Sequence, residues 1–504
     1  MSLTSFSFFA FLIASLILYY ITGPKLQKYV LFASTMFFFI MASGSKALQL
    51  TLILAMIIVL TYGGARAIDA FQGRKRTICT VTIISLLVLN LFTLKYVYNL
   101  AELFNSAFRI GADVSWLKLA APIGISYFTL SAIGYLMEVN WGNYPAEKNF
   151  CVVANFVSFF PQIISGPISR FGEMQAQFQK KQALNYDNIY YGCVRMIWGY
   201  FKKLVISDRI ALVVQAVYGN YEERGGLAIL FAMGCYAIQL YTDFSGCMDI
   251  VVGAARLYGV TLPENFQAPF FSQTISEFWR RWHITLGTWF KDYVMYPVLK
   301  TKTFVNMGKK LKKRYGKTAG KKIPSYLSIL IVWFLIGLWH GGILYFFVAS
   351  ALIPCCYLIG GDFFEPQFKK LKALLHIKET NIVFRVFQSV RTTFLMCICW
   401  VFLCTESVSG GVKALTCIFT NLLQPVNIMA LLAEAGIGMG KLALLTVCIL
   451  VLFVVDFMIY KKISVTKWLS ERFFLIRWVL LYAALLMILF YGMVGESSFI
   501  YFQF

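Results

Sequence analysis

The sequence has few charged residues for its length. Only 14% of its 504 residues are charged and 59% are hydrophobic, whereas an ordinary soluble domain has about 25% charged residues. Water is therefore not the solvent for most of this protein's surface. The composition excludes an ordinary soluble globular domain.

The chain also lacks the motifs of several enzyme classes. It has no glycine-rich phosphate loop, no Ser/His/Asp order typical of a hydrolase, and no CxxC pair or Cys/His spacing for a metal. Most of its twelve cysteines lie within apolar stretches, where a thiol behaves as a small hydrophobic group. We therefore expect neither a disulfide framework nor a bound metal or cofactor.

Long apolar stretches, in contrast, are abundant. A membrane-spanning helix needs roughly 20 apolar residues. Uncharged stretches of suitable length cover residues 3–21, 29–45, 47–65, 77–94, 119–137, 151–169, 225–242, 323–361, 414–433 and 478–495, and stretches with a few polar residues cover 188–205, 386–405 and 442–460. The pattern predicts an all-α polytopic membrane protein with about eleven to fourteen membrane helices. The stretch 323–361 must turn at Gly341–Gly342, and the first stretch is expected to be a retained helix because it lacks the features of a signal peptide.

Basic residues outnumber acidic residues by 46 to 23. Ten of them lie in residues 300–322, where no acidic residue occurs: Lys300, Lys302, Lys309, Lys310, Lys312, Lys313, Arg314, Lys317, Lys321 and Lys322. Cytoplasmic loops of membrane proteins carry such an excess, so we expect this run to be a cytoplasmic loop beside anionic lipids. An acidic carrier or a phosphorylated donor is the alternative ligand, and a nucleic-acid partner is not expected. A second polar connection, residues 362–385, predicts an extramembrane amphipathic segment.

No internal repeat divides the chain, and we expect a single membrane domain over residues 1–504. Residues 1–110 contain no candidate for chemistry and are expected to form scaffold helices, residues 115–345 a catalytic core, and residues 346–504 the closing helices. Proline and glycine interrupt the apolar stretches at 122–127 and 161–167. Broken helices at membrane depth are tolerated only beside other protein or a wet cavity, so the cavity is expected in the middle of the chain.

His340 is the first candidate for chemistry. It ends an apolar stretch, Trp333 to Gly342, and is one of only three histidines. Burial keeps an imidazole neutral, which is the form that accepts a proton from a hydroxyl group. The glycines at 337, 341 and 342 are expected to let a substrate approach. A core histidine bonded to a neighbouring helix is an equally weighted alternative.

Two further clusters contain polar residues in apolar surroundings. In residues 277–293, three tryptophans alternate with Arg280, Arg281 and His283, a pattern that slightly favours an aromatic belt at the membrane interface. In residues 241–249, Asp243 and Asp249 are six positions apart and so do not share a helix face. We expect Asp243 to pair with an arginine such as Arg280 or Arg281 in a structural role. Asp456 is a lone intramembrane acid without an assigned role.

Taken together, these clusters resemble the membrane-bound O-acyltransferase superfamily, and specifically its bacterial branch that includes the alginate O-acetylation membrane protein. The likeness rests on residues 122–129 (PIGISYFT), 161–170 (PQIISGPISR), 241–249 (YTDFSGCMD), 263–269 (PENFQAP), 278–286 (FWRRWHITL), 338–341 (LWHG) and the ending 499–504 (FIYFQF). Glu138 departs from the pattern, since relatives often have an aspartate in its context.

The resemblance implies a many-helix fold around a central funnel or pore, with re-entrant or interfacial helices. It implies that His340 is catalytic and that His283 is the second polar residue of the site. The residues expected to bind substrate or to line the funnel are Asn265, Arg280, Arg281, Trp282, Trp339, Asp243 and Ser245.

The resemblance also implies transfer of an acetyl group from a cytoplasmic thioester donor, such as acetyl-CoA or an acyl carrier, for O-acetylation of an extracellular or cell-wall polysaccharide. It implies that the partner is an extracytoplasmic acetyltransferase or a glycan acceptor. It also implies that the protein lies in the bacterial cytoplasmic membrane. Three alternatives stay open: D-alanyl transfer from an acidic carrier protein, a transporter or channel, and a passive assembly platform. Transporters commonly contain two related halves, which this sequence lacks.

Overall fold

The computed structural model describes residues 1–493, 495, 499 and 500, so most of the family-like ending at 499–504 lies outside the described residues. In the described part the chain is helical, and its extended pairing is limited to one antiparallel bridge between Phe266 and Trp282. The chain divides into two compact units, which are described separately. The first contains Met1–Tyr200 and Gly246–Glu264, and the second contains Phe201–Ser245 and Asn265–Met493.

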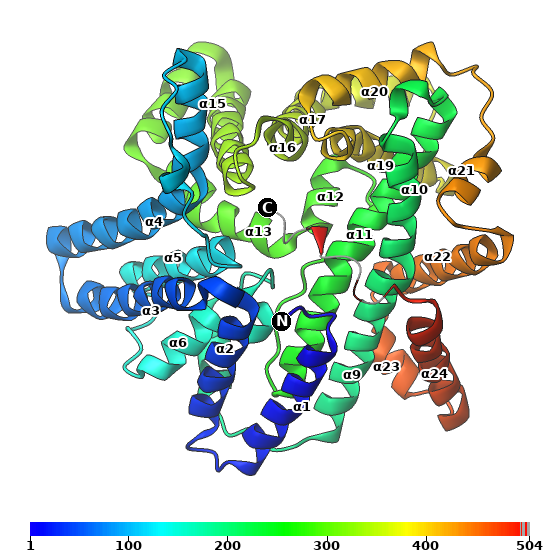
Figure 1. Cartoon of the computed structure of the whole chain (residues 1–504). Coiled ribbons are helices and arrows are strands. Elements are labelled where there is room, and N and C mark those ends of the chain that lie inside the picture. The colour runs from blue at the N-terminus through cyan, green and yellow to red at the C-terminus, as the bar shows by residue number, and fades with distance from the viewer. Residues whose placement is uncertain (494, 496–498, 501–504) are drawn as a thin grey trace. The chain divides into compact units, whose positions relative to one another are not determined.

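The first unit is built from long helices followed by shorter ones. It contains α1 (Phe6–Ile21), α2 (Gln27–Ser43), α3 (Ala47–Ala70), α4 (Gly73–Phe108), α5 (Ile125–Trp141), α6 (Phe150–Ser158), α7 (Phe160–Ile163), α8 (Phe171–Gln179), α9 (Tyr186–Tyr200) and the last part of α11 (Gly226–Leu257). Helices α3, α4 and α5 lie side by side (Figure 1). Helices α9 and α11 approach closely at Gly192 and Gly253, because a Cβ on Gly253 would lie 2.6 Å from the Gly192 carbonyl oxygen. Small residues at such contacts are a common way for membrane helices to pack.

The second unit begins with a π-helical turn (Phe201–Ser207) and contains the histidines. Its helices are α10 (Asp208–Tyr218), the first part of α11, α12 (Ile275–Arg281), α13 (Ile284–Phe290), α14 (Tyr296–Lys300), α15 (Lys302–Trp339), α16 (Leu344–Phe347), α17 (Ile353–Phe363), α18 (Glu365–Leu374), α19 (Ile382–Cys404), α20 (Val408–Thr420), α21 (Ile428–Glu434), α22 (Met439–Tyr460), α23 (Val465–Ser470) and α24 (Phe474–Tyr491). Further π-helical turns cover Lys291–Met295 and Val348–Leu352.

Eight helical segments of the described residues are long and apolar enough to cross a membrane, which confirms the predicted all-α polytopic membrane protein. They are Gln27–Ala70, Gly73–Phe108, Gly226–Leu257, Lys302–Trp339, Leu344–Phe363, Ile382–Cys404, Met439–Tyr460 and Phe474–Tyr491. Helices α1 and α20 are apolar but shorter. The segment Gln27–Ala70 bends at Gly44, where φ is 60° between α2 and α3. The predicted single domain and central funnel stay predictions.

Two of the predicted spans are broken in the structure. The interruption at 161–167, predicted from its proline and glycine residues, is confirmed, whereas the expectation of one span over 414–433 was wrong. Residues 151–169 form α6, the four-residue α7 and a non-helical segment, and residues 414–433 are divided between α20 and α21. Pro161 lies in the first turn of α7, Pro167 in the non-helical segment that follows, and Pro425 between α20 and α21. Proline has no N–H to donate to the preceding turn, which favours a break at such a position. The break is not obligatory, since Pro324 lies inside α15.

The basic run at 300–322 is helical, so the expectation of a loop was wrong. Gly316 has φ 87° and ψ 174°, which is not helical, and it divides α15 into two parts, 302–315 and 317–339. The two parts pack against each other, because a Cβ on Gly308 would lie 3.0 Å from the Gly320 carbonyl oxygen. Residues 302–322 therefore form a helical hairpin that turns at Gly316. The predicted turn at Gly341–Gly342 is confirmed, since α15 ends at Trp339 and both glycines have positive φ.

Candidate functional site

His283 lies at the junction of two short helices. Helix α12 ends at Arg281 and α13 begins at Ile284. His283 has φ 48° and ψ 49°, a left-handed conformation that is unfavourable for a residue other than glycine. The backbone is held there because the Ile284 N–H donates to the Asn265 carbonyl oxygen at 3.0 Å. The imidazole is only 3% exposed.

The Asn265 side chain fixes the tautomer of His283. Its Oδ1 accepts hydrogen bonds from the Thr285 backbone N–H at 3.1 Å and from the Thr285 hydroxyl at 3.0 Å, and it lies 3.2 Å from His283 Nδ1. An amide oxygen only accepts, so Nδ1 must carry the proton and Nε2 keeps its lone pair. Burial also lowers the pKa of His283 to about 3. His283 is therefore a neutral imidazole with a basic nitrogen at Nε2.

His340 follows directly after the last helical residue of α15. Its N–H donates to the Ile336 carbonyl oxygen at 3.0 Å, and its side chain is buried, with 7% exposure. Its ring centroid lies 4.8 Å from that of Trp339 and 5.1 Å from that of Phe346, the latter on α16. Gly341 has φ 122°, which a side chain would disfavour, and opens on free space, whereas a Cβ on Gly337 would collide with Phe347. Gly337 is thus a packing residue, and the expectation that it admits substrate was wrong.

Trp339 lies beside both histidines. Its ring centroid is 6.0 Å from that of His283 and 4.8 Å from that of His340. Two histidines 57 positions apart in the sequence thus contact the same indole. We call His283, His340, Trp339 and Asn265 the histidine cluster. A route from solvent to the two buried imidazoles stays a prediction.

Asp243 and Ser245 belong to a separate group of buried charges. Lys203 Nζ lies 2.7 Å from Asp243 Oδ1 and 2.9 Å from Asp208 Oδ1, and all three side chains are at most 4% exposed. We call Lys203, Asp208 and Asp243 the ion cluster. The expected pairing of Asp243 with Arg280 or Arg281 was therefore wrong, although its expected structural role fits this arrangement. Ser245 accepts a hydrogen bond from Lys202 Nζ at 2.8 Å.

Neither of these two lysines was predicted as a site residue. Lys202 and Lys203 lie in the apolar stretch 188–205, and adjacent lysines in such a stretch are the signal that could have predicted buried ion pairs. Asp456, which had no assigned role, accepts a hydrogen bond from the Tyr241 hydroxyl at 2.9 Å.

The two arginines and Trp282 differ from one another in their surroundings, and their roles in binding substrate or lining the funnel stay predictions. Arg280 is exposed and donates to Ser276 in its own helix at 3.0 Å. Arg281 pairs with Glu277 at 2.9 Å. Trp282 is 3% exposed and its ring packs against Phe278, Trp400 and Phe266. An aromatic belt needs rings at the protein surface, so this interpretation was wrong for Trp282 and also for the buried Trp289.

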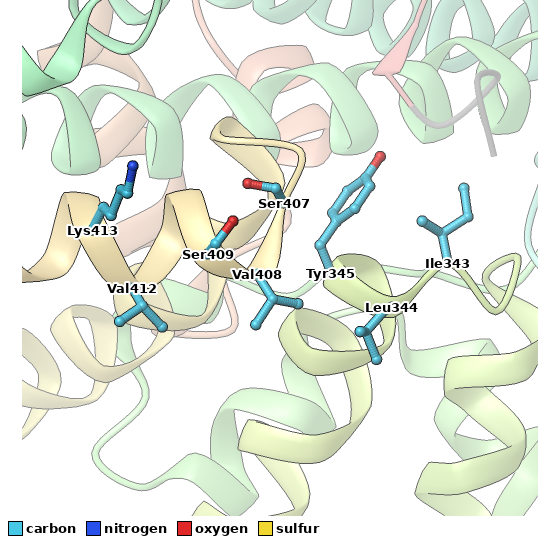
Figure 2. Close-up of a pocket in the computed structure, with 8 residues that line it drawn as sticks. All are labelled: Ile343, Leu344, Tyr345, Ser407, Val408, Ser409, Val412 and Lys413. Atoms are coloured by element: carbon cyan, nitrogen blue, oxygen red, sulfur yellow. The ribbon is translucent and has the colours of Figure 1, made fainter. Parts of the chain in front are cut away.

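A pocket of about 740 Å³ lies next to the helix that contacts His340. It is lined by Ile343, Leu344, Tyr345, Ser407, Val408, Ser409, Val412 and Lys413. Figure 2 shows the Tyr345 side chain with Ile343 and Leu344 on one side and the side chains at the start of α20 on the other. The pocket is open and mostly apolar, and Lys413 at its edge pairs with Glu222 at 3.3 Å. No predicted site residue lines this pocket.

The fold and these contacts define a multi-pass helical membrane protein with two buried histidines in its interior. The family model of the membrane-bound O-acyltransferases, MBOAT, matches residues 3–310. The chain belongs to this family. The matched region includes His283 and Asn265 and ends before His340.

The chain is similar to relatives named for three acyl-transfer activities. The chain is 32% identical to the probable alginate O-acetylase AlgI of Pseudomonas aeruginosa over 341 residues, which are 66% of this chain and 60% of the relative. It is 33% identical to the peptidoglycan O-acetyltransferase of Helicobacter pylori over 45% of this chain and 44% of the relative. It is 29% identical to the teichoic acid D-alanyltransferase of Bacillus subtilis over 53% of this chain and 65% of the relative. The chain spans about half of the length of the curated relatives it matches.

Proposed function

We propose that this protein transfers an acetyl group from a cytoplasmic thioester donor to a hydroxyl acceptor, in the O-acetylation of an extracellular or cell-wall polysaccharide. The observation that carries the proposal is the contact of His283 and His340 with one indole, in a chain of the membrane-bound O-acyltransferase family. Alginate and peptidoglycan O-acetylating relatives support acetyl as the acyl group. We place the protein in the bacterial cytoplasmic membrane, with acetyl-CoA or an acyl carrier as donor and an extracytoplasmic acetyltransferase or glycan as acceptor.

In the proposed reaction His340 is the general base. It accepts the proton of the acceptor hydroxyl while the oxygen attacks the thioester carbonyl carbon. The C–S bond breaks, the ester bond forms, and the proton passes to the departing thiolate. General-base catalysis contributes about a hundred- to ten-thousand-fold in rate.

His283 orients a reactant in this proposal. Because Asn265 holds its proton at Nδ1, the Nε2 atom faces a reactant as a hydrogen-bond acceptor. The aromatic rings around both imidazoles keep water scarce, which protects a thioester from hydrolysis.

The test uses cells that lack the native copy and are fed labelled acetate. We expect the wild-type chain to restore label in the surface polysaccharide and His340→Ala to abolish it. His376→Asn is the matched control, because His376 is exposed and Asn accepts its left-handed backbone, φ 51°. Normal labelling by His340→Ala, with protein at wild-type level in the membrane, would refute the assignment.

D-alanyl transfer is the second candidate, because a D-alanyltransferase is among the relatives. The same cells fed labelled alanine distinguish the two reactions. If alanine label reaches the polysaccharide with the wild-type chain but not with His340→Ala, the transferred group is D-alanyl instead of acetyl. The proposed role of His340 would then be unchanged. Label from neither substrate would leave the transporter and assembly-platform alternatives.

A further inference from the structure

Helix α18 is attached at both ends to helices of membrane-spanning length. The segment Leu344–Phe363 ends two residues before α18 begins at Glu365, and α19, the next such segment, begins at Ile382. α18 must therefore lie near one surface of the membrane, on the side where both neighbours emerge.

One face of α18 and its flanks is apolar and uncovered. Phe364, Phe368, Leu371 and Leu375 are spaced by four, three and four residues, so they lie on one side of the helix. Their exposed fractions are 49%, 52%, 52% and 58%. No residue of α18 itself is buried.

Three lysines lie on α18 beside its apolar face. Lys369, Lys370 and Lys372 lie outside the apolar stripe on the same helix, and Lys369 pairs with Glu365 at 2.7 Å. The second arm of the α15 hairpin is connected to the end of α17, directly before α18, because Lys322 Nζ lies 2.8 Å from Asp362 Oδ2. We call the ten cations of residues 300–322 together with these three lysines the basic surface.

We propose that the basic surface binds anionic phospholipid headgroups and that α18 lies in the membrane interface with its apolar stripe among the acyl chains. A helix with an apolar stripe and flanking lysines is the type that binds in this position, and clustered cations are attracted to anionic lipids. A soluble phosphorylated donor or an acidic carrier would neutralise the cations but would leave Phe364, Phe368, Leu371 and Leu375 in water. A lipid surface covers both features. The proposal is independent of acyl transfer.

The experiment measures hydrogen exchange of residues 365–375 in the full-length protein in lipid nanodiscs. We expect phosphatidylglycerol in a phosphatidylcholine nanodisc to slow exchange in this helix by about tenfold or more, as expected for an amphipathic helix that becomes bound. High salt should reverse part of this effect, because the attraction of exposed charges is screened.

Matched variants separate the two halves of the proposal. Phe368→Glu adds a charge to the apolar stripe and should remove the slowing, whereas Ala373→Glu adds the same charge to the other face and should keep it. Lys369→Gln with Lys370→Gln should reduce the slowing, and Lys180→Gln with Lys181→Gln, exposed lysines elsewhere, should not.

Three outcomes would overturn the proposal. Equal exchange with and without phosphatidylglycerol would show that headgroup charge is not recognised. Equal effects of Phe368→Glu and Ala373→Glu would show that the stripe does not enter the membrane. Slowing by coenzyme A in pure phosphatidylcholine nanodiscs, as strong as that by phosphatidylglycerol, would assign the surface to a soluble donor.

Discussion

The ion cluster and the histidine cluster are both polar groups buried in one unit of an apolar protein, yet they differ in charge. Lys203 lies between two carboxylates, with both ion pairs below 3 Å. His283 is neutral, and its described neighbours are the Asn265 amide and aromatic rings. A buried charge is tolerated only with its counter-charge, so the ion cluster is explained by the stability of the fold. The neutral imidazole of His283 among aromatic rings needs another explanation, and chemistry supplies one.

The two clusters meet on helix α11. Asp243 belongs to the ion cluster, and the next residue, Phe244, packs its ring perpendicular to that of His283 at 4.9 Å. The ion cluster therefore fixes the position of the helix against which one catalytic candidate packs. The comparison predicts opposite phenotypes: loss of folded protein for the ion cluster and loss of transfer in folded protein for the histidine cluster.

The largest expected effect is that of Lys203→Met. The substitution leaves Asp208 and Asp243 buried without their cation, which should cost roughly 3–5 kcal/mol of stability. Thermal unfolding of the purified protein in detergent measures it, with Lys180→Met, at an exposed position, as the control. Adding Asp208→Asn and Asp243→Asn to Lys203→Met should recover part of the loss. Wild-type stability of Lys203→Met would show that the cluster is not charged.

His340→Ala should lose transfer activity and keep its stability, the reverse of what is expected for Lys203→Met. Loss of the general base should lower the transfer rate about a hundred- to ten-thousand-fold, while the midpoint of thermal unfolding stays close to that of the wild type. Rate and unfolding are measured on the same preparation. Parallel loss of both would make His340 a packing residue and would remove the contrast between the clusters.

His283→Gln is expected to have an intermediate effect that shows in the pH profile. Glutamine can still donate to Asn265 and accept from a reactant, so we expect a loss of about tenfold rather than a complete loss of transfer. The pKa of His283 is lowered to about 3 by burial, so this residue does not change protonation between pH 5 and 9. The acid limb of the pH–rate profile should therefore keep its position in the variant. A shifted acid limb would identify His283 as the titrating base.

The sequence predicted the residues of the histidine cluster better than those of the ion cluster. The apolar stretches predicted a helical membrane protein, and the rarity of histidine directed attention to His283 and His340, because these features depend on composition and local order. The partner of Asp243 could not be predicted, because Lys203 is 40 positions away and the pairing depends on how the π-helical turn packs on α11. The contact of both histidines with Trp339 depends in the same way on packing between elements far apart in the sequence.

The hairpin in the basic run was missed for a local reason. The abundance of lysine suggested a loop, but lysine has a high helix propensity, and the two parts of α15 pack through Gly308 and Gly320. Membrane topology can explain why such residues are basic without determining whether they form a helix or a loop.

Arg280→Gln should have the smallest effect on transfer and on stability. It tests whether the functional site extends from the histidine cluster to α12. The resemblance implies that Arg280 binds substrate, but its described hydrogen bond goes to Ser276 one turn earlier in α12, and its side chain is exposed. Removal of an exposed charge usually changes stability by less than about 0.5 kcal/mol. We therefore expect near wild-type unfolding and transfer within about twofold, since no described contact joins Arg280 to either histidine. The measurement is the KM for the thioester donor beside kcat. A rise of KM with unchanged kcat and stability would extend the site to α12, because it would show that Arg280 binds the donor in the ground state and the transition state alike.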